Sequence, residues 1–142
     1  MSNRAEDILI QGVRLLEPLF SAHGFVYAPL NKGDSSGGQY ASAEFVRGHR
    51  RFEFHFRYSL GIVIYHLGSQ SVSHEEYMLS VLGKPNASRY PGCSQSPLDA
   101  FSHLRDDLLD YGMDFLEGSD EAFLSRIEDG RSRWASRPKL PA

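Results

Sequence analysis

The first apolar residues of the chain recur at the spacing of a helix. They predict a helix over residues 4–22 that has one apolar side. Pro18 should kink the last turn or end the helix early, because proline has no backbone N–H and its ring crowds the preceding turn. The apolar side consists of Ile8, Leu9, Leu15, Leu16, Leu19 and Phe20.

The middle of the chain alternates apolar and polar residues, a pattern typical of β-strands. Strand-like runs cover residues 25–30, 39–47, 51–58 and 62–67. The polar, glycine-rich stretch 31–38 between the first two runs is predicted to be a flexible loop. We therefore expect a four-stranded antiparallel meander, in which the run 25–30 can pair at either edge.

One face of this sheet is expected to be aromatic and buried. If Gly48-His49 is a two-residue hairpin loop, Phe45 lies opposite Phe52 and Ala43 lies opposite Phe54. The large rings of Phe54 and Phe56 are then paired with the small side chains of Ala43 and Ala41, as a packed sheet requires. The same face carries Ala41, Phe56, Val63, Tyr65 and Leu67.

Helix signals fill the second half of the chain. Ser73 and Glu76 form a capping box that opens a short helix, and Gly83 ends it. Ser96 is the expected N-cap of a second helix, which runs to Gly118.

A third helix is expected to begin at Ser119 and to turn Phe123 and Ile127 inward. Residues 131–142 carry four basic residues and two prolines, so they are expected to form a loose basic tail. The sequence thus predicts one α+β domain over residues 1–130: an N-terminal helix, a four-stranded antiparallel meander, and three helices packed on its aromatic face.

Composition restricts the possible functions. A length of 142 residues suits one globular domain, and a single cysteine, Cys93, excludes an internal disulfide. The net charge of −3 argues against non-specific nucleic-acid binding. No apolar run approaches the roughly 20 residues that span a membrane, and residues 1–9 do not have the pattern of a signal peptide. We expect a cytoplasmic protein that binds neither nucleic acid nor membrane.

The second face of the predicted sheet carries candidate chemistry. Glu53 should lie opposite Glu44 and opposite or diagonal to His66. Two carboxylates and two imidazoles suit a metal ion or general acid–base catalysis. Cross-strand pairs with arginine would explain the same residues as a solvated face, and two isoleucines among polar neighbours would suit a binding face. The face comprises Tyr40, Ser42, Glu44, Val46, Arg51, Glu53, His55, Arg57, Ile62, Ile64 and His66.

The last two predicted helices are strongly acidic. Between Asp99 and Asp129 there are ten acidic residues and only Arg105 and Arg126 as basic ones, a net charge of −8. This pattern indicates either an ordinary solvated surface or a docking surface for a basic protein. The residues best placed for such docking are Asp106, Asp107, Asp110 and Asp114.

Motifs spread over most of the chain resemble a small bacterial protein family of unknown function. That resemblance implies a stand-alone bacterial protein and supplies no catalytic residues. The build, a helix followed by a meander and acidic helices, is also similar to immunity proteins of bacterial toxin systems. The motifs are Ser36-Gly37-Gly38, the run 44–48, the run 51–57, Ser59-Leu60-Gly61, the run 73–78, Tyr90-Pro91-Gly92 and the run 97–101.

The leading hypothesis is a non-enzymatic protein-interaction module, in its sharpest form an immunity-type inhibitor of a basic toxin enzyme. It assigns no cofactor and no catalytic or metal-binding residue. The alternative is a small hydrolase or metal-dependent enzyme that uses Glu44, Glu53, His55 and His66. A third possibility is a homodimer that pairs this sheet face with itself and buries Ile62 and Ile64.

Overall fold

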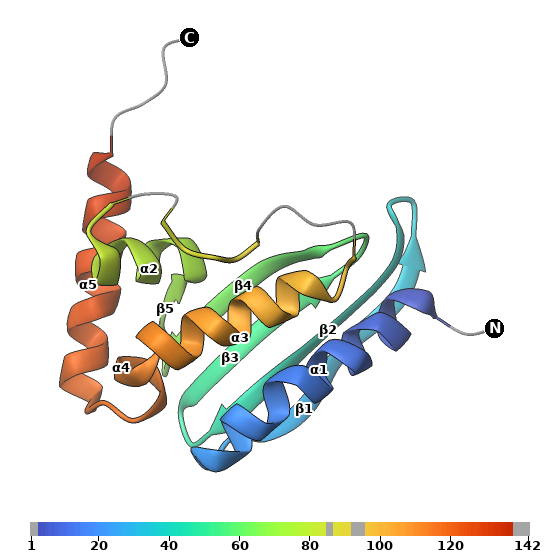
Figure 1. Cartoon of the computed structure of the whole chain (residues 1–142), viewed down its shortest axis with the longest axis horizontal. Coiled ribbons are helices and arrows are strands. Elements are labelled where there is room, and N and C mark those ends of the chain that lie inside the picture. Colours follow the sequence, from blue (N-terminus) through green and yellow to red (C-terminus); the bar gives the residue numbers. More distant parts are fainter. Residues whose placement is uncertain (1–2, 85–86, 92–95, 138–142) are drawn as a thin grey trace, which may run out of the picture.

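The structure, a computed structural model, describes residues 3–84, 87–91 and 96–137. Within these residues the chain forms an N-terminal helix, a five-stranded antiparallel sheet and four further helices (Figure 1). The elements are α1 (Arg4–Ala22), β1 (Val26–Ser35), β2 (Gly38–Arg47), β3 (Arg50–Phe56), β4 (Leu60–Leu67), β5 (Gln70–Ser73), α2 (His74–Leu82), α3 (Asp99–Tyr111), α4 (Met113–Leu116) and α5 (Asp120–Ser136).

The sheet is a meander in which each strand pairs with the next one along the chain. The predicted hairpin register is confirmed, because Phe45 pairs with Phe52 and Ala43 with Phe54. Gly48 adopts the left-handed conformation (φ 59°) that the tight turn between β2 and β3 requires. The turn chemistry and the aromatic alternation therefore fixed the same register.

The prediction of four strands is wrong by one, and its first loop is partly a strand. β5 is a fifth strand of only four residues, too short to show an alternating pattern. β1 continues to Ser35 through much of the stretch predicted as a loop, since its backbone pairs with β2 as far as Gly38. The register of this pair shifts between Pro29 and Lys32, so the edge strand is irregular there.

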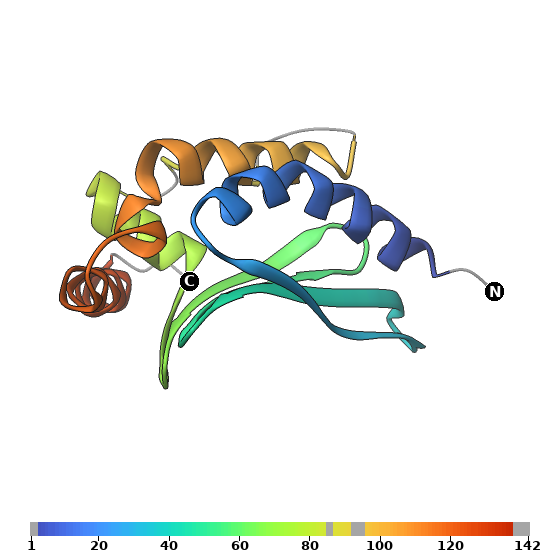
Figure 2. The same cartoon turned by 90° about the horizontal axis from the view of Figure 1, so that it is seen from below.

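Helices α1 and α3 lie side by side on the aromatic face of the sheet (Figure 2). Phe20 of α1 stacks on Phe45 with ring centroids 4.3 Å apart, and Phe101 of α3 packs edge-on against Phe54. The two helices approach closely at Gly12, where a Cβ atom would lie 2.4 Å from the Phe101 ring. The prediction that helices cover the aromatic face is confirmed, but of the helices after the sheet α3 lies there, beside α1, rather than the predicted three (Figure 2).

Helices α2, α4 and α5 gather at the other end of the molecule (Figure 1). Phe115 and Phe123, both buried, continue the aromatic cluster there, with ring centroids 5.1 Å apart. The buried side chain of Arg50 donates hydrogen bonds to the carbonyl oxygens of Phe115 and Gly118. This arginine thereby satisfies carbonyl groups that the end of the short helix α4 leaves free.

Several helix boundaries differ from those predicted. α1 continues through Pro18 to Ala22. The capping box of Ser73 is present, but α3 begins at Asp99 rather than beside Ser96, and no side chain caps it. The expected single helix up to Gly118 is divided at Gly112.

The last helix begins where the sequence predicted and ends later. Ser119 caps α5, and Phe123 and Ile127 are buried, as predicted. Residues 131–136, expected to belong to a loose tail, continue α5, whereas residues 138–142 lie outside the described residues, as does Cys93. Among the described helices, none has the length and apolar character needed to cross a membrane.

Candidate functional site

The face of the sheet opposite α1 and α3 is not covered by any described helix (Figure 2). We call it the open face. The strand registers align its side chains in rows, so that Glu53 lies between Glu44 and Ile64, and Arg51 lies between Val46 and His66. Its residues are Val26, Ala28, Tyr40, Ser42, Glu44, Val46, Arg51, Glu53, His55, Arg57, Ile62, Ile64 and His66.

Glu53 holds two histidines at the centre of the open face. Its Oε2 lies 2.5 Å from Nε2 of His55, the next residue on the same side of β3. Its Oε1 lies 2.8 Å from Nε2 of His66, which sits diagonally across on β4. The predicted proximity of Glu53 and His66 is therefore present, and His55 joins them.

The hydrogen bonds favour the ionised form of Glu53. Burial alone would raise the pKa of Glu53, but hydrogen bonds from His55 and His66 outweigh it and lower that pKa below its ordinary value. An ionised Glu53 accepts hydrogen bonds from Nε2 of both rings, which leaves Nδ1 of each ring without a hydrogen bond among the described residues. Each ring thus keeps one nitrogen that can contact solvent or a ligand.

The charge of the second carboxylate on the face, that of Glu44, is compensated by a different residue. It lies directly opposite Glu53 and is nearly buried, and Arg51 donates a hydrogen bond to its Oε2 at 2.7 Å. The repulsion expected between the two facing carboxylates is therefore relieved by one arginine and two histidines. Within the described part of the chain, no group of three or more His, Cys, Asp or Glu side chains is arranged to hold a metal ion.

A hollow of about 350 Å³ lies at one end of the open face. Arg57 is anchored in its wall, because Nη1 donates to Gly38 O at 2.8 Å and to Ser35 Oγ at 3.1 Å. The guanidinium also sits 5.2 Å from the ring centre of Tyr40. The hollow is lined mainly by Tyr40, His55, Arg57, Tyr58, Gly61 and Ile62.

A larger cleft of about 860 Å³ lies on the other side of the turn between β3 and β4. Ile8 of α1 and Ala100 of α3 contribute to its walls, whereas Glu44, Glu53 and His66 line neither the cleft nor the hollow. Its lining also includes Pro91 and Ser96. Residues 92–95, between these two, are not among the described residues. Arg57, Tyr58 and Gly61 border both spaces.

Asp107 does not belong to an acidic docking surface, contrary to expectation. Its side chain is fully buried, with Oδ2 at 3.0 Å from Nε2 of His74. The backbone N–H groups of Arg89 and Tyr90 donate to the same carboxylate at 2.9 and 3.0 Å. His74 in turn is 2.7 Å from the hydroxyl of Tyr65, so the group ties α2, α3 and the segment 87–91 to the sheet.

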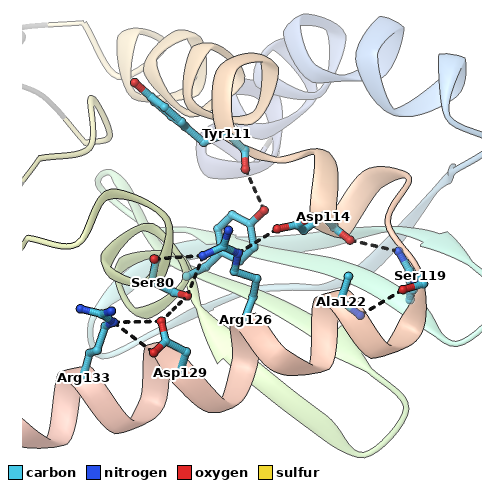
Figure 3. A network of polar contacts seen from close by, with 10 residues as sticks. Ser80, Tyr111, Asp114, Ser119, Ala122, Arg126, Asp129 and Arg133 are labelled. Atoms are coloured by element: carbon cyan, nitrogen blue, oxygen red, sulfur yellow. Dashed lines mark hydrogen bonds and ion pairs between the residues drawn. The ribbon is translucent and has the colours of Figure 1, made fainter.

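Most other acidic side chains of these helices are paired with basic ones. Asp110 binds Arg89 at 2.6 Å, and Asp114 binds Arg126 of α5 at 2.8 Å (Figure 3). Among the described residues, Asp106 pairs only with its neighbour Arg105, at 3.6 Å. Arg105 and Arg126 are already counted in the net charge of −8, so their pairs do not reduce it. Three arginines from outside residues 99–129 pair with acids of the segment and partly compensate its charge: Arg50, Arg89 and Arg133.

The same pairing continues along α5. Arg126 also donates to the carbonyl oxygen of Ser80, whose hydroxyl donates to Asp129, and Arg133 contacts Asp129 one turn later (Figure 3). These acidic residues connect α5 to α2 and α4. Their role in the described structure is to join helices.

Sequence reasoning placed the open face correctly and missed part of the hollow. The sequence predicted Tyr58 only as the last residue of the strand run 51–58 and Gly61 only as part of the motif Ser59-Leu60-Gly61. Their position beside Arg57 depends on how the turn between β3 and β4 is folded. His74 follows the predicted cap Ser73, and nothing in its sequence neighbourhood indicates Asp107, 33 residues away, as its partner.

The chain matches no protein-family model, and comparison with curated proteins and with solved structures finds no significant match.

Proposed function

We propose that the chain is a non-enzymatic protein-interaction module that binds a partner protein through the open face. The observation that carries this proposal is the absence of a described helix over this face, together with its exposed apolar side chains. Ile62 is 53% exposed and Val26 is 69% exposed, although both lie on sheet strands. Exposed apolar groups among polar neighbours are typical of binding surfaces.

The charges of the open face indicate what kind of surface it would bind. Glu44 and Glu53 balance Arg51 and Arg57, so the face has no net charge while its histidines are neutral. A partner therefore needs apolar side chains opposite Val26 and Ile62 rather than an excess of one charge. An immunity-type inhibitor that covers a toxin enzyme remains the sharpest form of the proposal.

The geometry favours the open face over the acidic helices as the site of contact. A basic partner would have to compete with Arg89 for Asp110 and with Arg126 for Asp114, and Asp107 is inaccessible. Disrupting such pairs on the protein offsets what a new basic group would gain.

The test is a comparative affinity capture from lysate of the source organism. Wild type is compared with Val26→Asp/Ile62→Asp, which places charges on the open face, and with Asp106→Lys/Glu121→Lys, which alters exposed acids. We expect a near-stoichiometric partner that the open-face variant loses and the acidic-helix variant keeps. Capture lost only by the acidic-helix variant, or no partner at all, would contradict the proposal.

Light scattering of the purified wild type and variants tests whether the partner is a second copy of the chain. A dimer that Val26→Asp/Ile62→Asp converts to a monomer identifies the occupant as the chain itself. A monomer at all concentrations leaves a different protein as the partner. Folding of each variant is checked by circular dichroism before comparison.

A small hydrolase or metal-dependent enzyme is the second candidate function. The observation in its favour is that Glu53 orients the imidazole of His55, which lines the hollow. A carboxylate-held histidine can act as a general base. The rate of hydrolysis of nitrophenyl esters, with and without added Zn²⁺, should then be lower in His55→Gln than in wild type. Equal rates in the two proteins would rule out this candidate function.

A further inference from the structure

We infer that the hollow is a binding site for a small organic acid, with one carboxylate attached to an aromatic or branched apolar body. The inference concerns this chain alone and does not depend on a protein partner. It rests on the size of the hollow, its apolar walls and the unpaired cation in its wall.

The size and the walls suit a small molecule. A volume of about 350 Å³ lies at the lower end of the range, roughly 300–1,000 Å³, that small-molecule sites occupy. Tyr58 is 78% exposed and Ile62 is 53% exposed, so both present apolar surface to water at the rim. A flat or branched apolar group would cover this surface and gain free energy from its removal from water.

The charge of the hollow comes from Arg57. Its guanidinium binds a hydroxyl and a carbonyl oxygen, and it forms no ion pair with any described residue. Arg51, on the same face, is by contrast paired with Glu44. Arg57 therefore presents a positive charge that is held in place but not neutralised.

Glu53, the carboxylate bonded to His55 in the wall of the hollow, does not line the hollow and forms no ion pair with Arg57. Both oxygens of Glu53 are occupied, one by His55 and one by His66. Arg57 contributes one positive charge to the lining of the hollow, which matches one carboxylate on the ligand. An arginine whose position is already fixed loses little conformational entropy on binding, and arginine pairs geometrically with carboxylates.

Gly61 provides a way to close the hollow. A Cβ atom at Gly61 would meet no atom within 4 Å, and its φ lies outside the left-handed region, so the backbone accepts a side chain. Gly61→Trp should fill the entrance, whereas Gly61→Ala should leave it open. Gly61→Ala controls for the loss of the glycine itself.

The experiment is a titration followed by amide NMR, with benzoate as the probe and benzamide as its uncharged isostere. For a ligand of this size a Kd of about 1 mM is expected. Benzoate should shift the resonances of Tyr40 and Ile62, which line the hollow but not the larger cleft. Benzamide should bind at least about tenfold more weakly, because it lacks the charge.

Variants complete the test. Arg57→Gln and Gly61→Trp should each weaken benzoate binding about tenfold or more, while Arg51→Gln and Gly61→Ala keep it unchanged. Equal binding of benzamide, or full binding to Arg57→Gln, would overturn the inference. Shifts confined to Ile8 and Ala100 would place the ligand in the larger cleft and overturn it equally.

Discussion

Asp106 and Asp107 are neighbours in the sequence with opposite surroundings. Asp106 is partly exposed beside Arg105, whereas Asp107 is buried and accepts hydrogen bonds from His74 and from two backbone N–H groups. A buried carboxylate with this many donors stabilises the fold because its removal leaves every one of those donors unpaired.

At this scale we predict that Asp107→Ala lowers the free energy of unfolding by about 3 kcal/mol or more. Asp106→Ala should change it by less than about 0.5 kcal/mol, as exposed substitutions commonly do. Urea denaturation followed by circular dichroism measures both. Similar small effects of the two substitutions would show that Asp107 does not hold the helices together.

Stability in acid should depend on the same carboxylate. Burial raises the pKa of Asp107, but hydrogen bonds from His74, Tyr90 and Arg89 lower it below the ordinary 3.8. A depressed pKa in the folded state stabilises the protein above pH 3.8, and this contribution is lost as the pH falls toward the folded-state pKa. Asp107→Asn should therefore lose less stability than wild type between about pH 5 and pH 3. Unfolding free energies from urea denaturation that fall equally with pH in wild type and in Asp107→Asn would contradict this.

At the scale of elements, α5 meets α2 at Gly130. A Cβ atom there would lie 2.4 Å from the carbonyl oxygen of Glu76, a backbone atom that cannot easily move. Alanine normally stabilises a helix relative to glycine by about 1 kcal/mol. Here we expect Gly130→Ala to destabilise the protein by about 1–3 kcal/mol, because it forces the helices apart.

Thermal unfolding checks the sign of this effect. Ser125→Ala, an exposed position on the same helix, is the control and should be neutral or slightly stabilising. A stabilising Gly130→Ala would mean that α2 and α5 do not pack as described.

Elements with a regular pattern were predictable from the sequence, and those without one were not. Gly48-His49 and alternating rings determined the pairing of β2 with β3. The end of β1 has no such alternation, because its residues are mostly exposed on both sides. β5 is too short for a pattern, and the division of the predicted second helix at Gly112 depends on packing around α4.

At the scale of the whole molecule, the sequence predicted the open face but not how charges pair. Alternation alone placed Glu53 and His66 together. By contrast, Asp120 pairs with Arg50, 70 positions away, and that pairing depends on how α5 docks on the sheet. The net charge of a segment therefore did not show which of its acidic side chains are already paired.

The two ends of the molecule share one continuous cluster of buried apolar residues, from Phe101 to Phe123. We therefore predict a single cooperative unfolding transition, because neither end can lose its helices without exposing the common cluster. Calorimetric and van't Hoff enthalpies should agree. A separate early transition that removes α2 and α5 alone would contradict the prediction.

The irregular outer strand β1 has a consequence for how the chain behaves when crowded. Pro29 offers no N–H, the ladder is interrupted between Pro29 and Lys32, and Lys32 adds a charge. A regular free edge would recruit strands of neighbouring chains and lead to fibrils, whereas these features discourage such growth. The sheet thus has a broad face open to contact and an edge that resists polymerisation.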